Sequence, residues 1–585
     1  MRIQVWELGE TMKLNPWRIT LILISAILLT GLSASTLPAA DPGDPPGRVA
    51  RLSLIQGKVS FQPSGETDWS EATVNRPVST GDRLFTDQGA RAELEVGPFA
   101  VRLAPSTDVT LANLSDQLMQ LGVGQGTLRV TLYELPEGNS VEIDTPNGAL
   151  LLQAPGSYRV DTAPDGNSTR VMVTAGSLQV SAGDLSKTVQ GGQTVQLTGT
   201  GPVMAAEIQA PPQDDFDHWC AGRDRRVQDS ASARQVGPAV PGAPDLDANG
   251  RWGTDPNYGP VWYPAAVPPD WVPYRYGHWV FIEPWGWTWV EAEPWGYAPF
   301  HYGRWVRIGP GWAWVPGPVV VRPVYAPALV AFVGGPGFGI GIGVQAWFPL
   351  GPREPFVPWY HYSPAYIRQV NVVNVTNITN ITNVTNVHYV NRQAGFTAVS
   401  GEAFRGGGRV DRGIVHVTPT QISHAEVMPH PDVTPTSHAV FGSRAVDPPP
   451  VRHSAYEYPG RAAVLTQPAP HPPVATPSGP GPRPPAYTPT TNSPPHAGGP
   501  PPTPFPHVYT RNAPPPTNPS FKTREGAYTS DPGRPLEPQQ MNNVRAGRPA
   551  GPTQDKEAIP HPQKQEKAAK PPAPSHEDHG DHSHH

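Results

Sequence analysis

Tryptophans recur at fixed spacing in the middle of the chain. Tyr276-Gly-His-Trp-Val280 leads to Trp285-Gly-Trp-Thr-Trp-Val290, and Tyr302-Gly-Arg-Trp-Val306 leads to Gly311-Trp-Ala-Trp-Val315. Each unit has the pattern of a β-hairpin. The tryptophans of each second strand alternate, so their rings are expected on one face of the sheet. A row of large flat rings can stack on the apolar face of a sugar or on a proline ring.

We call this row of tryptophan rings the aromatic wall. Its expected ligand is an envelope glycan or peptidoglycan, with arginines forming hydrogen bonds to the hydroxyl groups of the ligand. The candidate ligand-binding residues are Trp279, Trp285, Trp287, Trp289, Trp305, Trp312, Trp314, Arg275 and Arg304. The alternative is that the rings fill the core of a small sheet with few aliphatic residues, because each ring buries a large area. Core packing is the interpretation that we favour.

Three carboxylates lie in the same stretch. Glu283, Glu291 and Glu293 could supply the acid and the nucleophile or base of a glycoside hydrolase, but sequence does not fix their separation. The chain has no nucleophile-elbow, phosphate-loop or zinc-protease motif. We therefore expect no enzymatic activity, with a cell-wall hydrolase kept as an alternative.

The last ten residues concentrate imidazoles and carboxylates. The candidate metal ligands are His576, His579, His582, His584 and His585. These side chains suit Zn, Ni or Cu ions, although a flexible tail loses entropy when it is ordered around a metal. No cofactor is expected.

Composition excludes several classes of protein. Lys plus Arg (43) nearly balances Asp plus Glu (49), so no basic field is present to attract nucleic acid. The single cysteine, Cys220, excludes an internal disulfide framework and a thiolate metal cluster. We expect Cys220 to be a small packed residue rather than a reactive thiol.

The N-terminus has the order of a secretory signal. Lys13 and Arg18 precede an uncharged run of fourteen residues from Ile19 to Leu32, and small residues follow it. As a helix this run rises only about 21 Å, which is less than the hydrocarbon core of a membrane. Residues 1–40 are therefore interpreted as a signal peptide, with an uncleaved anchor as the alternative. The expected location is the periplasm, the cell envelope or the medium; with an anchor, it is the periplasmic side of the inner membrane.

Residues 50–200 alternate between apolar and polar types. Examples are Arg91–Val96, Ser140–Thr145 and Thr169–Thr174, and glycine and asparagine turns separate the segments. Period-two alternation with frequent turns predicts an all-β domain.

This stretch resembles the FecR domain of bacterial envelope proteins. The resemblance rests on Gly81-Asp-Arg-Leu-Phe-Thr86, Leu103-Ala-Pro-Ser-Thr-Asp-Val-Thr-Leu111, Gly156-Ser-Tyr-Arg-Val160 and Val173-Thr-Ala-Gly-Ser-Leu-Gln-Val180. It implies a β-rich periplasmic fold of a kind that relays receptor state to a sigma factor in iron-citrate signalling. Only eighteen residues precede Ile19, whereas a signalling member has a cytoplasmic anti-sigma region there.

A helical connector is predicted over residues 214–236, because acidic residues precede basic ones as the helix dipole favours. The stretch that follows resembles an uncharacterised Trp/Gly/Pro-rich domain found after FecR domains in exported proteobacterial proteins. The resemblance rests on the tryptophan repeats, on Trp262-Tyr-Pro264 and on Trp347-Phe-Pro-Leu-Gly-Pro-Arg-Glu354. We place this β domain at 245–386, ending in the Asn/Thr repeat of 374–385. Proline dominates residues 410–585, which predicts a disordered tail with polyproline II bias.

The expected fold is therefore mostly β: a FecR-like β domain, a small Trp-rich β-hairpin domain and a long disordered Pro-rich tail. The expected function is that of an exported, non-enzymatic binding or scaffold protein. Its partner would be an envelope glycan or an envelope protein, with no nucleic acid and with membrane contact only through an uncleaved N-terminal segment. The alternative is a signal-transduction component that senses the state of the envelope.

Overall fold

The computed structural model describes residues 43–319, 322–335, 343–371, 388–442, 444–450, 464–465 and 509–551. Three predicted features lie outside the described residues: the signal at 1–40, the Asn/Thr repeat at 374–385 and the histidines of the last ten residues. Within the described ranges, no helix is both long and apolar enough to span a bilayer.

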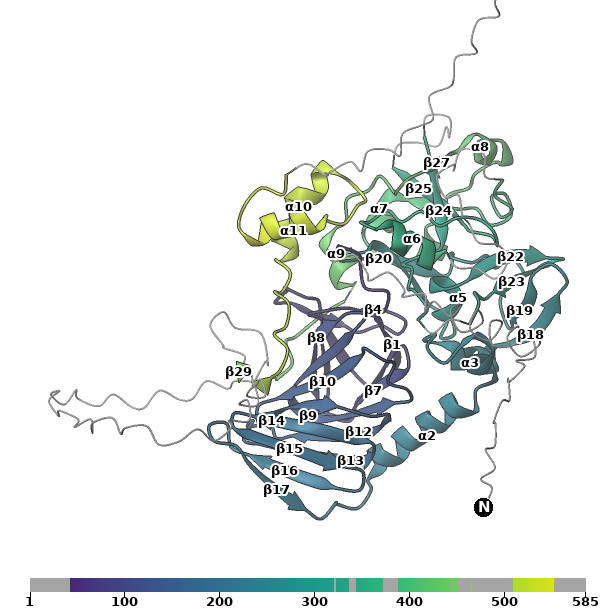
Figure 1. The fold of residues 1–585 in the computed structure, drawn as a ribbon. Helices are drawn as coiled ribbons and strands as arrows, with labels where there is room; N and C mark the ends of the chain where they lie inside the picture. The colour runs from purple at the N-terminus through teal and green to yellow at the C-terminus, as the bar shows by residue number, and fades with distance from the viewer. Residues whose placement is uncertain are drawn as a thin grey trace, which may run out of the picture. The chain divides into compact units, whose positions relative to one another are not determined.

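The first part of the chain, residues 43–208, consists of strands (Figure 1, purple to blue). In chain order they are β1 (Ala50–Gln56), β2 (Val59–Gln62), β3 (Trp69–Glu71), β4 (Pro77–Val78), β5 (Arg83–Thr86), β6 (Arg91–Val96), β7 (Phe99–Leu103), β8 (Asp108–Leu114), β9 (Leu118–Leu132), β10 (Ser140–Thr145), β11 (Gly148–Leu152), β12 (Gly156–Thr162), β13 (Ser168–Ala175), β14 (Ser177–Ala182), β15 (Leu185–Gln190), β16 (Thr194–Thr198) and β17 (Met204–Ile208). We call this part the N-terminal β region. The mostly β fold class is confirmed.

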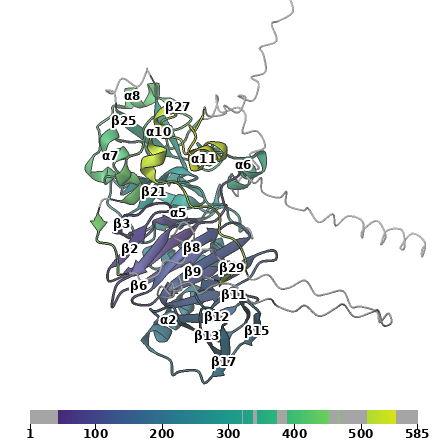
Figure 2. The same cartoon turned by 90° about the vertical axis from the view of Figure 1, so that its left-hand side faces the viewer.

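The strands form two sheets that share β9. Sheet A has the order β4-β1-β6-β7-β9-β12-β13-β16-β17. Sheet B continues from β3 in the order β3-β2-β5-β8-β9-β10-β11-β14-β15. The first half of β9 pairs in sheet B and the second half in sheet A (Figure 2). The side chains between the two sheets form one apolar core, which includes Leu84, Val101, Leu128 and Val171.

Gly126 marks the point where β9 passes from one sheet to the other. Its φ is +92°, a left-handed value, and a Cβ atom there would overlap Thr107. Only glycine adopts this backbone without strain. The bend therefore lets one strand serve both sheets.

Helix α2 (Asp215–Asp229) covers the outer face of sheet A. It starts at Asp214, whose side chain accepts from the Asp217 N–H in a capping box. Phe216 and Cys220 pack against Ala104. The predicted connector is helical, with a break at Ser230 before α3 (Ala231–Val236).

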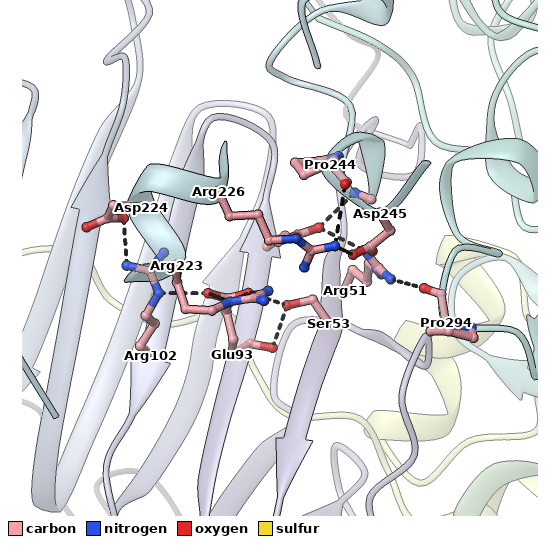
Figure 3. A network of polar contacts seen from close by, with 12 residues as sticks. Arg51, Ser53, Glu93, Arg102, Arg223, Asp224, Arg226, Pro244, Asp245 and Pro294 are labelled. Atoms are coloured by element: carbon pink, nitrogen blue, oxygen red, sulfur yellow. Dashed lines mark hydrogen bonds and ion pairs between the residues drawn. The ribbon is translucent and has the colours of Figure 1, made fainter. Parts of the chain in front are cut away.

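A row of charged side chains lies beneath α2. Glu93, Arg102, Arg129 and Arg159 lie opposite one another on β6, β7, β9 and β12. Acids of the helix pair with the arginines: Asp224 with Arg102 at 2.7 Å, and Asp217 with Arg129 at 2.8 Å and with Arg159 at 2.7 Å. Arg223 pairs with Glu93 (Figure 3). The three sheet arginines are therefore neutralised by the helix that covers them.

The same network continues to Asp245, in the turn η1 (Ala243–Asp245). The Asp245 carboxylate lies 2.5 Å from Arg51 of β1 and 2.6 Å from Arg226 of α2 (Figure 3). Arg51 also donates to the carbonyl of Pro294 at 2.8 Å. Charged contacts therefore tie β1 to the tryptophan-rich part of the chain.

The second part, residues 243–428, is called the Trp-rich region. Its strands are β18 (Gly250–Asp255), β19 (Gly259–Pro264), β20 (Gly277–Ile282), β21 (Gly286–Glu291), β22 (Arg304–Ile308), β23 (Gly311–Val315), β24 (Val330–Gly334), β25 (Val344–Pro349), β26 (Thr397–Ser400) and β27 (Glu426–Met428). Its helices and turns after η1 are α4 (Leu246–Asn249), α5 (Ala298–His301), α6 (Pro364–Val370), α7 (Gly401–Arg405), η4 (Val410–Arg412) and α8 (Pro419–His424). The sheets have the orders β18-β19-β23-β22, β20-β21 and β26-β25-β24-β27.

Both predicted hairpins are present. In the first, Trp279 lies opposite Trp289, and in the second, Trp305 lies opposite Trp314. The sequence repeat, in which Trp279 and Trp305 lie 26 residues apart, is therefore also a structural repeat with one cross-strand tryptophan pair in each copy.

Part of the expected tail is ordered. Residues 410–450 contain η4, α8, β27, α9 (Ser437–Phe441) and β28 (Ala445–Val446), and β28 pairs with β3 at the edge of sheet B. Residues 509–551 contain β30 (Tyr509–Thr510), α10 (Phe521–Ser530) and α11 (Pro538–Arg545) (Figure 1, yellow). β30 pairs with β29 (Val464–Leu465). Buried Tyr509, Phe521 and Tyr528 explain the difference from the prediction, because isolated aromatic residues anchor segments whose average composition favours disorder.

Candidate functional site

The tryptophans proposed as a binding wall lie inside the protein. Trp279, Trp287 and Trp289 are 0 % exposed, and Trp312, with 6 %, is the most exposed of the seven candidates. The other three, Trp285, Trp305 and Trp314, are each 1 % exposed. An exposed aromatic wall is therefore not formed, and the core-packing interpretation accounts for these rings.

Trp279 shows how the rings are held. Its ring centroid lies 5.4 Å from that of Trp289 and 5.3 Å from those of Phe332, Trp347 and Phe404. Most of these pairs are edge-to-face or tilted, which is the geometry that aromatic quadrupoles favour. The alternation in the sequence correctly places the rings on one face, but β24, β25 and α7 cover that face.

Arg304 is also a structural residue. It is 2 % exposed and donates to the carbonyl of Glu354 at 3.3 Å and to the side chain of Asn371 at 3.0 Å. Burial lowers the pKa of Arg304 to about 10. A ligand on the surface does not reach this guanidinium, so its proposed contact with a glycan is not supported.

The three glutamates considered for hydrolysis do not line an open site together. The Glu283 side chain is 5 % exposed and accepts from the Tyr528 hydroxyl at 2.7 Å. Glu291 is 1 % exposed, and one of its oxygens accepts from the Trp289 indole at 2.9 Å. Burial raises the pKa of Glu291 to about 8. Glu283 and Glu291 are therefore parts of the packed interior, whereas Glu293 is half-buried.

A groove of about 750 Å³ lies at one side of the Trp-rich region. Its lining comes from three stretches of chain: residues 251–275 with β18 and β19, the tip of the β22–β23 hairpin, and residues 393–422 with β26 and α8. Two of the candidate ligand-binding residues, Arg275 and Trp312, line it. The structure therefore brings these two to an accessible site and leaves the other seven inside the protein.

The groove combines aromatic rings with positive charge. Tyr263, Trp271, Trp312 and Phe396 contribute rings, and five prolines add flat apolar surface. The charged lining residues are Arg251, Asp270, Arg275 and Arg307, and His416 also lines the groove. With three arginines and one carboxylate, the described lining carries a net positive charge and lacks the paired carboxylates of a glycosidase.

The arginines of the groove are held differently. Arg275 donates to the Phe396 carbonyl at 2.8 Å, and burial lowers its pKa. The Arg251 guanidinium stacks over the Tyr263 ring, 4.5 Å from the centroid. Arg307 is exposed near the tip of the β22–β23 hairpin, opposite Trp312. Arg251 and Arg307 therefore present charge to solvent at the rim.

Sequence reasoning missed Arg251, Tyr263, Phe396 and His416 as possible ligand contacts. These residues belong to no repeat, and more than a hundred and fifty positions separate Arg251 from His416. A pattern of tryptophans identifies the core of this region, whereas the groove arises from how distant loops meet beside that core.

Cys220 agrees with its prediction as a packed residue. It is 0 % exposed, and burial raises the pKa of its thiol to about 12. At neutral pH it is therefore a protonated side chain within the contact between α2 and sheet A.

Comparison with known proteins gives a family for part of the chain. Residues 243–354 match a family of unknown function, DUF6600. The match contains both tryptophan hairpins and overlaps residues 245–354 of the predicted Trp-rich domain. It does not reach residues 50–200, so the FecR resemblance stays a prediction.

No curated protein matches the chain. Two crystal structures of a candidate anti-sigma factor from Parabacteroides distasonis ATCC 8503, at 1.65 and 2.50 Å resolution, are similar to part of it. Their sequence identities are 12 % and 13 %, with TM-scores of 0.20. In each case the similarity covers 22 % of this chain and spans 60 % of the other.

Proposed function

We propose that this protein is an exported, non-enzymatic binding protein of the bacterial envelope, and that it binds a glycan in the groove of the Trp-rich region. The observation that carries the proposal is the combination, in one groove of about 750 Å³, of Tyr263 and Trp312 with Arg251, Arg275 and Arg307. Aromatic rings offer faces for sugar rings, and guanidinium groups bind carboxylates in a bidentate manner.

The charge of the groove favours an acidic glycan. Carboxylate-bearing wall polymers such as peptidoglycan carry the negative groups that three arginines would pair with, whereas a neutral glycan would leave these charges without partners. Asp270, the single carboxylate of the described lining, is available to accept from sugar hydroxyl groups.

The test is retention of purified full-length protein on insoluble peptidoglycan and on an array of acidic and neutral glycans. We expect retention of the wild type and a loss of at least tenfold in affinity for the double variant Arg251→Ala/Arg307→Ala. Arg225→Ala, at an exposed position of α2 outside the groove, is the matched control and is expected to bind like the wild type.

Two results would count against the proposal. One is the absence of retention on every acidic glycan. The other is clearing of peptidoglycan in a zymogram, which would favour a hydrolase. Binding that falls equally in Arg225→Ala would show that overall charge, rather than the groove, attracts the polymer.

A further inference from the structure

The C-terminal segment 509–551 lies against both parts of the protein, and its first residues contact the outer face of sheet B. Tyr509 packs on Ala149 and Ala182 and donates from its hydroxyl to the Gly201 carbonyl at 2.8 Å. Thr510 is 0 % exposed. This contact joins residues more than three hundred positions apart.

One carboxylate accepts hydrogen bonds from residues 510–512 at the start of this segment. The Glu142 side chain of β10 accepts from the Arg511 N–H at 2.5 Å, from the Asn512 N–H at 3.3 Å and from the Thr510 hydroxyl at 3.1 Å. The side-chain amide of Asn512 donates to its second oxygen. Two consecutive backbone N–H groups and two side chains thus converge on Glu142.

Gln120 of β9 lies beside Glu142 in the sheet. Its side-chain amide donates hydrogen bonds to acceptors of residues 510–512. Its amide nitrogen lies 2.7 Å from the Thr510 hydroxyl oxygen, from the Asn512 carbonyl oxygen and from the Asp144 carboxylate, and its two N–H groups are shared among these three acceptors. The hydrogen-bond donors of residues 510–512 therefore bond to Glu142, and the acceptors of these residues bond to Gln120. This complementarity selects a threonine and an asparagine two residues apart, after an aromatic residue.

The chemistry of this face suits release as well as binding. Gln120, Glu142 and Asp144 lie on the outer face of sheet B, away from the apolar core. Water can solvate these groups when residues 509–512 leave, and that release does not open the core between the sheets. Polar contacts of this kind are typical of interfaces that form and dissociate.

We propose that the outer face of β9 and β10 is a peptide-recognition site for a Tyr-Thr-x-Asn turn, and that residues 509–512 occupy it as a ligand carried in the same chain. The site is separate from the groove and does not depend on the proposed glycan binding. A bound C-terminal segment keeps the site closed, and its release opens the site.

To test the C-terminal segment as a ligand, the chain between this segment and the rest of the protein is cut, so that only non-covalent contacts hold the two pieces together. A protease recognition sequence inserted between residues 480 and 495 of the full-length chain allows the folded protein to be cut without removing any part of it. After cutting, the C-terminal piece is expected to stay with the body in gel filtration, and its dissociation rate is measured.

Glu142→Gln and Asn512→Ala are each expected to speed dissociation at least tenfold. The double variant should dissociate no faster than Glu142→Gln alone, because the bond that Asn512→Ala removes is one of those made to Glu142. Glu207→Gln, at an exposed position of β17, is the control. Asn512→Ala changes only the ligand side, so it still gives an answer if Glu142→Gln does not fold. Immediate separation of the wild-type pieces, or unchanged rates in both single variants, would overturn the proposal.

Occupancy by a second molecule is tested with a fluorescent peptide of residues 505–516. We expect the peptide to bind the uncut Asn512→Ala variant more tightly than the wild type, whose own segment competes for the site. Binding should be lost in Glu142→Gln/Asn512→Ala. Equal binding to all three proteins would place the peptide elsewhere and contradict recognition at this face.

Discussion

Arg102 of β7 and Asp224 of α2 form an ion pair of 2.7 Å that fastens the helix to sheet A. Arg102 is 0 % exposed and also pairs with Glu93 at 2.7 Å. The Arg102 guanidinium therefore has one partner in the sheet and one in the helix, and it keeps both only while α2 stays in place.

Replacing Arg102 by alanine is expected to lower the free energy of unfolding by about 3–5 kcal/mol, because Asp224 loses its ion-pair partner and buried Glu93 keeps only Arg223. Urea unfolding followed by circular dichroism measures this loss. Arg225→Ala, on the exposed side of the same helix, should change stability by less than about 0.5 kcal/mol. A loss below about 1 kcal/mol for Arg102→Ala would show that water replaces the pair.

The aromatic core is expected to tolerate truncation poorly. Trp279→Ala removes a ring that contacts four others and leaves a cavity, so the Trp-rich region should lose about 3–5 kcal/mol of stability. Near-UV circular dichroism and thermal unfolding report the change. Trp279→Phe keeps part of the contact and should lose less. Equal, small effects in both variants would contradict core packing.

The buried carboxyl group of Glu291 makes the free energy of unfolding depend on pH, and the direction of this dependence follows from its raised pKa. Burial raises its pKa to about 8, against about 4.3 in an unfolded chain, so the folded state binds the additional proton between these values. The free energy of unfolding therefore falls as the pH rises from about 4.3 to 8, by up to about 1.4 kcal/mol per pH unit.

Glu291→Gln removes this dependence. The variant should gain stability relative to the wild type at pH 8, and the gain should shrink towards pH 5. Chemical unfolding at several pH values measures it, with Glu207→Gln as the exposed control. The same stability difference at pH 5 and pH 8 would mean that the carboxyl group is not buried in its neutral form.

Cys220 is expected to resist thiol reagents in the folded protein. A disulfide reagent at pH 8 should modify no thiol in native buffer and one thiol in 6 M guanidinium chloride. Burial and a pKa raised to about 12 both disfavour the reactive thiolate. Rapid native labelling would show that α2 leaves sheet A on the timescale of the reaction.

Local patterns predicted the strands well. Arg91–Val96 and Ser140–Thr145 were expected as strands from their alternation, and β6 and β10 have the same bounds. The connector helix followed from its acidic start and basic end. In each case the prediction rests on at most about ten to twenty consecutive residues. Over that length, the period of apolar residues and the residues at the helix ends determine the secondary structure.

Contacts between distant segments could not be predicted in this way. The bond from Thr510 to Glu142 spans 368 positions, and the alternation around Glu142 predicts its strand but not its partner. The groove likewise depends on where loops meet. Trp287 and Trp312 look alike in sequence, yet one lies in the interior and the other lines the groove, because the final position depends on what covers each strand.

The pairing of β28 with β3 has a consequence for synthesis of the chain. Ser70 beside this edge bonds to the Phe441 carbonyl, 371 residues later. At about 5–20 residues per second, a ribosome needs roughly 20–75 s to make that interval. During this time the edge of β3 lacks the strand that later covers it, and such an edge pairs readily with other chains. The strand β28, in the last third of the chain, covers this edge of β3 once it has been made.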